Sequence, residues 1–291
     1  MITCHSEYGR LKSLYVKRAE DAFVGKEVLD RDWKRLNYTA RPSLAKALHE
    51  YKEFESLLSS TGATLHHFSA AEDTSIDSIY CRDASIATDR GVILCNMGKP
   101  ARNMEPDAQG KAYQSKGIPV LGRIQAPGTV EGGDVAWLDP STLAVGHTYR
   151  TNESGIGQLG SLLKPLGVSV MAVPLPHYRG PADVFHLMSI FSPVDRDLAV
   201  VYSPLMPILF RNELLVRGYQ LIEVPDREFG SMGCNVLALG PRNVLMVKGN
   251  SLTRKALLKA ACKVQEYEGE NISKKGGGGP TCLTRPLQRE Q

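Results

Sequence analysis

The sequence predicts an α/β fold in which a unit of two strands, a helix and a third strand is repeated about five times. Three observations support this prediction: hairpin patterns recur at intervals of roughly 50 residues, helical patterns lie between them, and a short apolar segment follows each helix. Because such a unit cannot bury its own apolar face, we expect the units to stack in a ring within a single domain, residues 1–291. A two-domain α/β chain divided near residue 128 is the alternative.

Four segments have the pattern of a strand hairpin, which is an apolar run, a polar turn and a second apolar run. The third hairpin is expected to have its first strand at 185–191 and its turn at 192–197. A fifth, degraded copy is expected in the N-terminal segment that ends at 14–16. The four hairpins are 80–95, 133–146, 185–202 and 234–247.

Helical patterns are expected in the same repeat. Apolar residues within 156–166 share one helical face, which Gly167 closes. Pro207 opens a helix that Gly218 closes, and Ser251 is a candidate N-cap for another. The helix of the first repeat is predicted at 42–61, and the short third strands are predicted at 63–66, 118–120, 168–170, 219–222 and 263–265.

The composition is that of an ordinary globular protein, with 42% hydrophobic and 23% charged residues. The net charge of +4 is not concentrated in runs, so we expect no nucleic-acid or membrane partner. The sequence contains no apolar stretch of transmembrane length and no signal-peptide layout, which favours a cytoplasmic protein. The six cysteines are scattered without zinc-ligand spacing, so we expect free thiols and no metal.

One cysteine has an unusual context. Four consecutive glycines, 276–279, lie just before Cys282. Such a backbone can take positive φ and approach a ligand closely, which suits a nucleophile at the mouth of a pocket. The alternative is a flexible tail that contains a cysteine. Cys234, in an apolar strand, is assigned to the core.

Polar residues occur at the starts of three hairpins, and the predicted ring would bring them to one end of a central hollow. Structural alternatives exist, since Asp83 could pair with Arg82, the segment 131–134 could be a plain turn, and His186 could be a core histidine. Their shared position in the repeat favours a common site. This set is Asp77, Asp83, Glu131, Asp134 and His186, and Cys282 lies where the ring closes.

A cysteine, a histidine and several carboxylates in one pocket form a nucleophilic site. The carboxylates outnumber those that a Cys–His protease needs. Two or three acids around one thiol suit a cationic, planar substrate, because a guanidinium pairs bidentately with carboxylate. A small guanidino compound is therefore the expected substrate.

Five stretches resemble the arginine deiminase / amidinotransferase superfamily, the guanidine-modifying enzymes with the pentein fold. In length and motif style the chain is most similar to the dimethylarginine dimethylaminohydrolases, because it has no room for the helical insertion of full arginine deiminases. The resemblance implies an α/β propeller of about five ββαβ modules with pseudo-fivefold symmetry. The stretches are DSIYCRD (77–83), TVEGGD (129–134), YRTNESG (149–155), HLMS (186–189) and GGPTCLT (278–284).

The resemblance also implies a two-step hydrolysis of arginine or a methylated or otherwise substituted arginine, giving citrulline and an amine. The thiolate of Cys282 would attack the guanidinium carbon. His186 would protonate the departing amine and then activate the water that cleaves the covalent thiouronium.

The remaining roles come from the same resemblance. Three acids would hold the guanidinium, one of them also near the histidine, and two arginines would bind the substrate carboxylate. No metal or other cofactor is implied, and a homodimer is allowed. The acids are Asp77, Asp83 and Glu131, of which Glu131 lies near the histidine, and the arginines are Arg150 and Arg102.

Two departures from the family pattern keep the substrate open. Met188 stands where arginine deiminases and amidinotransferases have an aspartate, which argues against both activities. Arg82 precedes Asp83, as it does in the deiminases. The substrate could therefore be a methylated arginine, arginine, a hydroxylated arginine or another guanidino compound. An amidinotransferase and a non-catalytic pentein-like binding module remain as alternatives.

Overall fold

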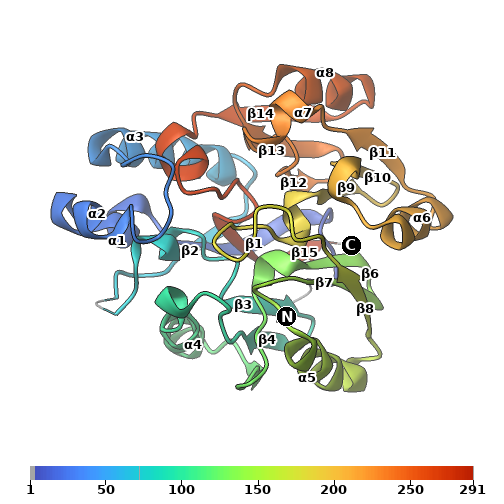
Figure 1. Cartoon of the computed structure of the whole chain (residues 1–291), viewed down its shortest axis with the longest axis horizontal. Helices are drawn as coiled ribbons and strands as arrows, with labels where there is room; N and C mark the ends of the chain where they lie inside the picture. The colour runs from blue at the N-terminus through green and yellow to red at the C-terminus, as the bar shows by residue number, and fades with distance from the viewer. Residues whose placement is uncertain (1–3, 72, 291) are drawn as a thin grey trace.

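The computed structural model describes residues 4–71 and 73–290. Within these residues the strands β1 to β15 form five separate three-stranded sheets. Figure 1 shows the sheets around the middle of the molecule, with the longer helices at its periphery. The predicted mixture of α and β structure, and the predicted repeat, are therefore confirmed.

Four of the sheets are each built from one continuous segment of chain. In each, the middle strand pairs antiparallel with the strand before it and parallel with the strand after it. The sheets are β3 (Ser85–Thr88), β4 (Gly91–Leu94) and β5 (Val120–Arg123); β6 (Val135–Asp139), β7 (Thr142–His147) and β8 (Ser169–Pro174); β9 (Phe191–Asp195), β10 (Leu198–Val201) and β11 (Gln220–Glu223); and β12 (Leu237–Gly240), β13 (Asn243–Val247) and β14 (Lys263–Tyr267).

A helix separates the second and third strand of each sheet, because a parallel pair needs a crossover connection. The helix in the crossover of the β9–β11 sheet, for example, begins after Pro207, as predicted. A short helix, α7 (Asp226–Phe229), precedes the last of these four sheets. The crossover helices are α4 (Glu105–Ser115), α5 (Glu153–Leu163), α6 (Ile208–Val216) and α8 (Ser251–Lys259).

The fifth sheet joins the two ends of the described chain. Strand β1 (Arg10–Val16) pairs antiparallel with β15 (Thr284–Glu290) and parallel with β2 (Thr64–His67). Three helices lie between β1 and β2: α1 (Ala19–Phe23), α2 (Lys26–Asp32) and α3 (Leu44–Ser59). Because β15 completes this sheet, the segment just before it is held against the other sheets, and Cys282 lies in that segment.

In the four continuous sheets the third strand is more exposed than the first two strands. Every residue of β3 and of β12 is buried, whereas β5 and β11 are partly exposed. The continuous apolar runs of the hairpins explain this, since a strand covered on both faces has no polar side to present. The first strand of each of these sheets lies at the opposite edge from the exposed third strand and is therefore the innermost, and β15 holds the same edge position in the fifth sheet. The residues that precede these strands begin in the interior.

Two sequence predictions about the elements are wrong. In the third repeat, Leu187–Ser189 is a 3-10 turn and the strand occupies Phe191–Asp195, where a turn was predicted. The capping interaction of α8 also differs, because the carboxylate of Glu228 accepts the backbone N–H groups of Leu252 and Thr253 at 2.8 Å. In addition, helix α4 was not predicted, since its mostly polar sequence lacks a continuous apolar stripe.

No helix of the described residues is long and apolar enough to span a membrane.

Candidate active site

Each of the five sheets has a polar residue just before its innermost strand. Asp83 precedes β3, Glu131 precedes β6, His186 precedes β9, Asn235 precedes β12 and Cys282 precedes β15. All five are buried. The repeat therefore brings one side chain from each sheet to the same region. The sequence analysis identified four of these residues and missed Asn235, which it read as part of an apolar strand.

Six of the seven predicted site residues line one cavity of about 220 Å³. The seventh, Glu131, is fully buried directly behind His186 and does not line it. The cavity wall also contains Met188, which the sequence analysis discussed, and Asn235 and three lysines, which it did not. The six predicted residues are Asp77, Asp83, Arg102, Arg150, His186 and Cys282, and the lysines are Lys99, Lys274 and Lys275.

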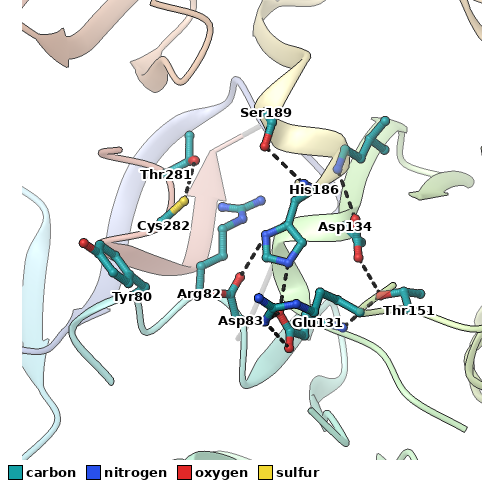
Figure 2. Close-up of polar contacts among 12 residues, drawn as sticks. Tyr80, Arg82, Asp83, Glu131, Asp134, Thr151, His186, Ser189, Thr281 and Cys282 are labelled. Carbon is teal, nitrogen blue, oxygen red and sulfur yellow. Dashed lines mark hydrogen bonds and ion pairs between the residues drawn. The ribbon is translucent and has the colours of Figure 1, made fainter. Parts of the chain in front are cut away.

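His186 is held by carboxylates on two sides (Figure 2). Its Nε2 lies 2.9 Å from Oε2 of Glu131, and its Nδ1 lies 3.9 Å from Oδ1 of Asp83. A Cβ atom at Gly133 would lie 2.4 Å from Nδ1 of His186, so this ring position requires glycine. Gly133 thus serves the packing of the histidine, while Gly132 lets the backbone approach the carbonyls of Arg82 and Ser85, so the segment is more than a plain turn.

The carboxylates control the protonation of His186. Burial opposes the charged ring, but Asp134, Asp83 and Glu131 outweigh burial and raise the pKa of His186 to about 9. Burial alone would raise the pKa of Glu131, yet its hydrogen bond with His186 and the charge of Arg150 hold that pKa well below its usual range. At neutral pH the pair is therefore an imidazolium beside a carboxylate, which makes His186 a proton donor.

Asp134 does not line the cavity, contrary to the expectation that it faces the central hollow. One oxygen accepts the backbone N–H of Leu187 at 3.1 Å, and the other accepts the hydroxyls of Thr148 and Thr151, both at 2.7 Å. Burial raises the pKa of Asp134 to about 6. Asp134 therefore anchors the turn that carries His186.

The glycine run before Cys282 lets two side chains approach the backbone closely. A Cβ atom at Gly278 would lie 2.4 Å from the Tyr80 ring, and one at Gly279 would lie 2.4 Å from Oδ1 of Asn235. Gly277 has φ of 79°, a conformation that favours glycine. Close approach and positive φ were both predicted, although the groups that approach are side chains of the protein. The segment is not a flexible tail, because its residues are largely buried.

Cys282 is buried, with 9% of its surface exposed, and it lines the cavity. Its Sγ lies 3.5 Å from Nδ2 of Asn235 and 3.8 Å from Oγ1 of Thr281. Burial and the negative charge of Asp83 raise the pKa of Cys282, while its polar contacts with Thr281 and Asn235 lower it. The thiol is therefore protonated at neutral pH until a positive charge arrives.

The two cavity acids are paired with cations of the protein. Lys99 Nζ lies 2.6 Å from Oδ2 of Asp77, and Arg102 forms a hydrogen bond with Oδ2 of Asp83. The guanidinium of Arg102 also binds Glu105 at 2.8 Å and the carbonyl of Tyr80 at 2.9 Å. Arg102 is thus largely engaged inside the protein, where it orients Asp83. The other oxygen of Asp83, Oδ1, is buried without a hydrogen-bond partner among the described residues.

The donor atoms of Asp83, Glu131 and His186 lie within 4.8 Å of one another, a spacing that could also hold a metal ion. In the structure Nε2 of His186 instead forms a hydrogen bond with Glu131, and Oδ2 of Asp83 accepts a hydrogen bond from Arg102. These contacts fit acid–base chemistry at the histidine.

The family described as N,N dimethylarginine dimethylhydrolase, eukaryotic, matches residues 27–289. An uncharacterized protein of Bacillus subtilis, YkgA, is 26% identical over 295 residues, which cover 98% of this chain and 95% of that protein. The arginine deiminase of Mycobacterium avium is 28% identical over 255 residues, which cover 73% of this chain and 60% of that enzyme.

Solved structures show the same fold. A mutant DDAH from Pseudomonas aeruginosa complexed with citrulline superposes with a TM-score of 0.77 at 22% identity, covering 96% of this chain and all of that chain. The substrate-bound N-terminal domain of ArgZ, an arginine dihydrolase of cyanobacteria, gives 0.81 at 17% identity and covers 96% and 98%. SxtG, an amidinotransferase from Microseira wollei, gives 0.76 at 16% identity and covers 100% and 98%. The chain belongs to the N,N dimethylarginine dimethylhydrolase family, within the guanidine-modifying pentein superfamily that its motifs predicted.

Proposed function

We propose that this protein hydrolyses the guanidino group of a methylated or otherwise substituted arginine, releasing citrulline and an amine through a covalent intermediate on Cys282. The observation that carries this proposal is the meeting of Cys282, His186 and the acids Asp77 and Asp83 in one cavity. Membership of the dimethylarginine dimethylhydrolase family supports the same reaction. The architecture that goes with it is a propeller of five modules with pseudo-fivefold symmetry, whose axis passes through this site.

The charges of the cavity suit a substrate that is positive at one end and negative at the other. Asp83 offers a buried oxygen without a hydrogen-bond partner among the described residues, which a guanidinium N–H can reach. Lys274 and Arg150 add positive charge to the same wall. A substituted arginine would place its guanidinium against Asp83 and Asp77 and its carboxylate against these cations. In this proposal Arg150, whose Nη1 lies 3.4 Å from Oε1 of Glu131, is assigned to the substrate carboxylate, whereas Arg102 acts through Asp83.

The first step begins with binding. A guanidinium beside Asp83 offsets the negative charge that raises the pKa of Cys282, so the thiol loses its proton to solvent. The thiolate then forms a bond to the guanidinium carbon. His186, protonated at neutral pH because its pKa is about 9, gives its proton to the substituted nitrogen. The carbon–nitrogen bond breaks, the amine leaves, and a thiouronium remains on Cys282.

The second step returns the enzyme to its starting state. His186 is now neutral, and Glu131 at 2.9 Å favours its protonation. The histidine takes a proton from water, and the hydroxide attacks the thiouronium carbon. The carbon–sulfur bond breaks with the electron pair going to Cys282, the ureido group loses the proton of the added hydroxyl to solvent, citrulline is released, and the thiolate takes up a proton from solvent to restore the thiol.

Met188 supports a methylated substrate. Its side chain is buried and lines the cavity together with His186 and Cys282. A thioether packs well against N-methyl groups but offers no strong acceptor to an unsubstituted N–H donor. Arginine deiminase relatives keep arginine itself as the second candidate substrate.

The test is a product assay. The protein is incubated separately with arginine, monomethylarginine, asymmetric dimethylarginine and hydroxyarginine, and products are identified by mass spectrometry. Citrulline with methylamine or dimethylamine is the expected result, and Cys282→Ser should abolish it while the fold remains intact. Citrulline from arginine alone would make the protein a deiminase, and transfer of the amidino group to an added amine would make it an amidinotransferase.

A second assay separates an enzyme from a binding module. Cys282 should react faster with a cationic haloacetamidine than with a neutral haloacetamide, because the acids Asp77 and Asp83 attract the cation. Equal rates with the two reagents would argue against a guanidine pocket.

A further inference from the structure

Five polar residues precede the innermost strands of the five sheets, and Asn235 is the one that the proposed reaction does not use. It is 6% exposed, it lines the same cavity, and it precedes β12 as Cys282 precedes β15. Its Nδ2 lies 3.5 Å from Sγ of Cys282. A buried amide this close to the reacting sulfur can influence both the position and the charge of that atom.

The orientation of the amide follows from its other contacts. Oδ1 of Asn235 accepts the backbone N–H of Thr281 at 3.1 Å and the hydroxyl of Thr281 at 2.9 Å. A flipped amide would turn its NH₂ group toward the backbone N–H of Thr281, which can only donate, and that bond would be lost even though the hydroxyl could accept instead. The NH₂ group therefore faces Sγ. The bare backbone of Gly279 makes room for this arrangement.

Thr281 does not replace this donor. Its hydroxyl oxygen lies 3.8 Å from Sγ, but a hydroxyl has one proton, and that proton goes to Oδ1 of Asn235. Among the described residues, Asn235 is therefore the side chain whose N–H is directed at the sulfur. A hydrogen bond to an ionised acceptor is worth more than one to a neutral acceptor. The contact favours the thiolate over the thiol.

We propose that Asn235 is a positioning residue that holds Sγ of Cys282 in the cavity and stabilises its thiolate through the Nδ2–H donor. This inference deepens the proposed function and rests on it for its meaning in catalysis. The contact itself can be tested without turnover.

The test measures the rate at which iodoacetamide alkylates Cys282 as a function of pH, read from the Cys282 peptide by mass spectrometry. The variants are Asn235→Ala, which removes the amide, and Asn235→Asp, which keeps the acceptor for Thr281 but loses the donor. The matched control is Asn250→Ala, which removes a fully buried asparagine bonded to Ser231 and Val247. Thr281→Val provides a further variant if either Asn235 variant fails to fold.

Asn235→Ala should raise the pH midpoint of alkylation by about one unit, so that the rate near neutral pH falls roughly tenfold. Asn235→Asp should raise the midpoint further, because its carboxylate also adds a negative charge beside the sulfur. Asn250→Ala should leave the midpoint unchanged, and Thr281→Val should shift it less than the Asn235 variants do. A folded Asn235→Ala whose midpoint matches the wild type would overturn the proposal. A higher plateau rate at alkaline pH with an unchanged midpoint would also overturn it, because loose packing alone produces that result.

Turnover separates the two proposals. If the wild type releases citrulline but the pH midpoint of Cys282 alkylation is unchanged in Asn235→Ala, the proposed function stands and the role of Asn235 is refuted. If the midpoint moves but no guanidino substrate is turned over, the contact is supported and the proposed function fails. When both stand, Asn235→Ala should lower kcat about tenfold or more with little change in KM, since the thiolate is needed for the chemical step.

Discussion

Replacing Glu131 with glutamine removes a charge from the site at almost constant volume. Glu131 is fully buried, accepts from Nε2 of His186 at 2.9 Å, and accepts the backbone N–H of Lys99 at 2.9 Å. The pKa of His186 rises from 6.5 to about 9, which corresponds to about 3 kcal/mol in favour of the imidazolium. Three carboxylates produce this rise against the opposing effect of burial, so on average each contributes about one unit, and Glu131 acts through both its hydrogen bond and its charge.

We therefore expect Glu131→Gln to lower the pKa of His186 by about one unit. The ring is followed by NMR titration, which does not depend on turnover. With a substrate from the product assay, the alkaline limb of the kcat profile should move down by the same amount, because the proton donor is lost at lower pH.

Glu228→Gln is the control for Glu131→Gln. Glu228 is also buried and accepts three hydrogen bonds, but they come from the start of helix α8. This variant should lower the free energy of unfolding without moving the His186 titration. The reasoning is refuted if folded Glu131→Gln titrates like the wild type, or if Glu228→Gln shifts the histidine equally.

Three further predictions concern stability. Gly278→Ala should lower the free energy of unfolding by several kcal/mol, measured with denaturant, and should reduce activity, because the added Cβ would overlap the Tyr80 ring. The control, Gly157→Ala, adds a Cβ in open space on α5 and should be neutral or stabilising. Glu7→Gln should cost about 3–5 kcal/mol, since it leaves the buried Arg82 without the carboxylate that it binds at 2.8 and 2.9 Å; a cost below about 1 kcal/mol would contradict this. The raised pKa of His186 contributes stability that is complete below pH 6.5 and is lost as the pH rises through about 9, so urea unfolding across this window should show the loss and Glu131→Gln should reduce it.

The strands were predictable where apolar runs alternate with turn residues. The β3–β4 hairpin fits this rule, because both strands are buried and the turn at Asp89–Arg90 is short. Helix α4 was not predictable in the same way, since much of its buried face consists of glutamate, glutamine and glycine. Glu105 at its start binds Arg102, so the helix is placed by a buried ion pair that no periodicity reveals.

The residue types of the site were predictable from the sequence, but whether each residue lines the cavity or is buried behind it was less predictable. Which residues line the cavity and which lie behind them depends on side-chain packing between sheets. Glu131 and Asp134 are both buried acids in one short segment, yet the first contacts the ring of His186 and the second its turn. Arg102 and Arg150 are likewise the same residue type, and what distinguishes Arg102 is that it binds Asp83 and Glu105 inside the protein. The sequence spacing of these residues does not distinguish such roles.

The repeat itself contains the signal that identifies Asn235. Asp83, Asn235 and Cys282 each stand two residues before an innermost strand, so a comparison of the repeats by strand position places the three in register. Glu131 and His186 stand further back, because a 3-10 turn is inserted before β6 and before β9. A fold that repeats a unit around one centre offers one such position per unit. In this chain all five carry a side chain that can donate, accept or share a proton, which is why the asparagine belongs with the other four rather than with the core.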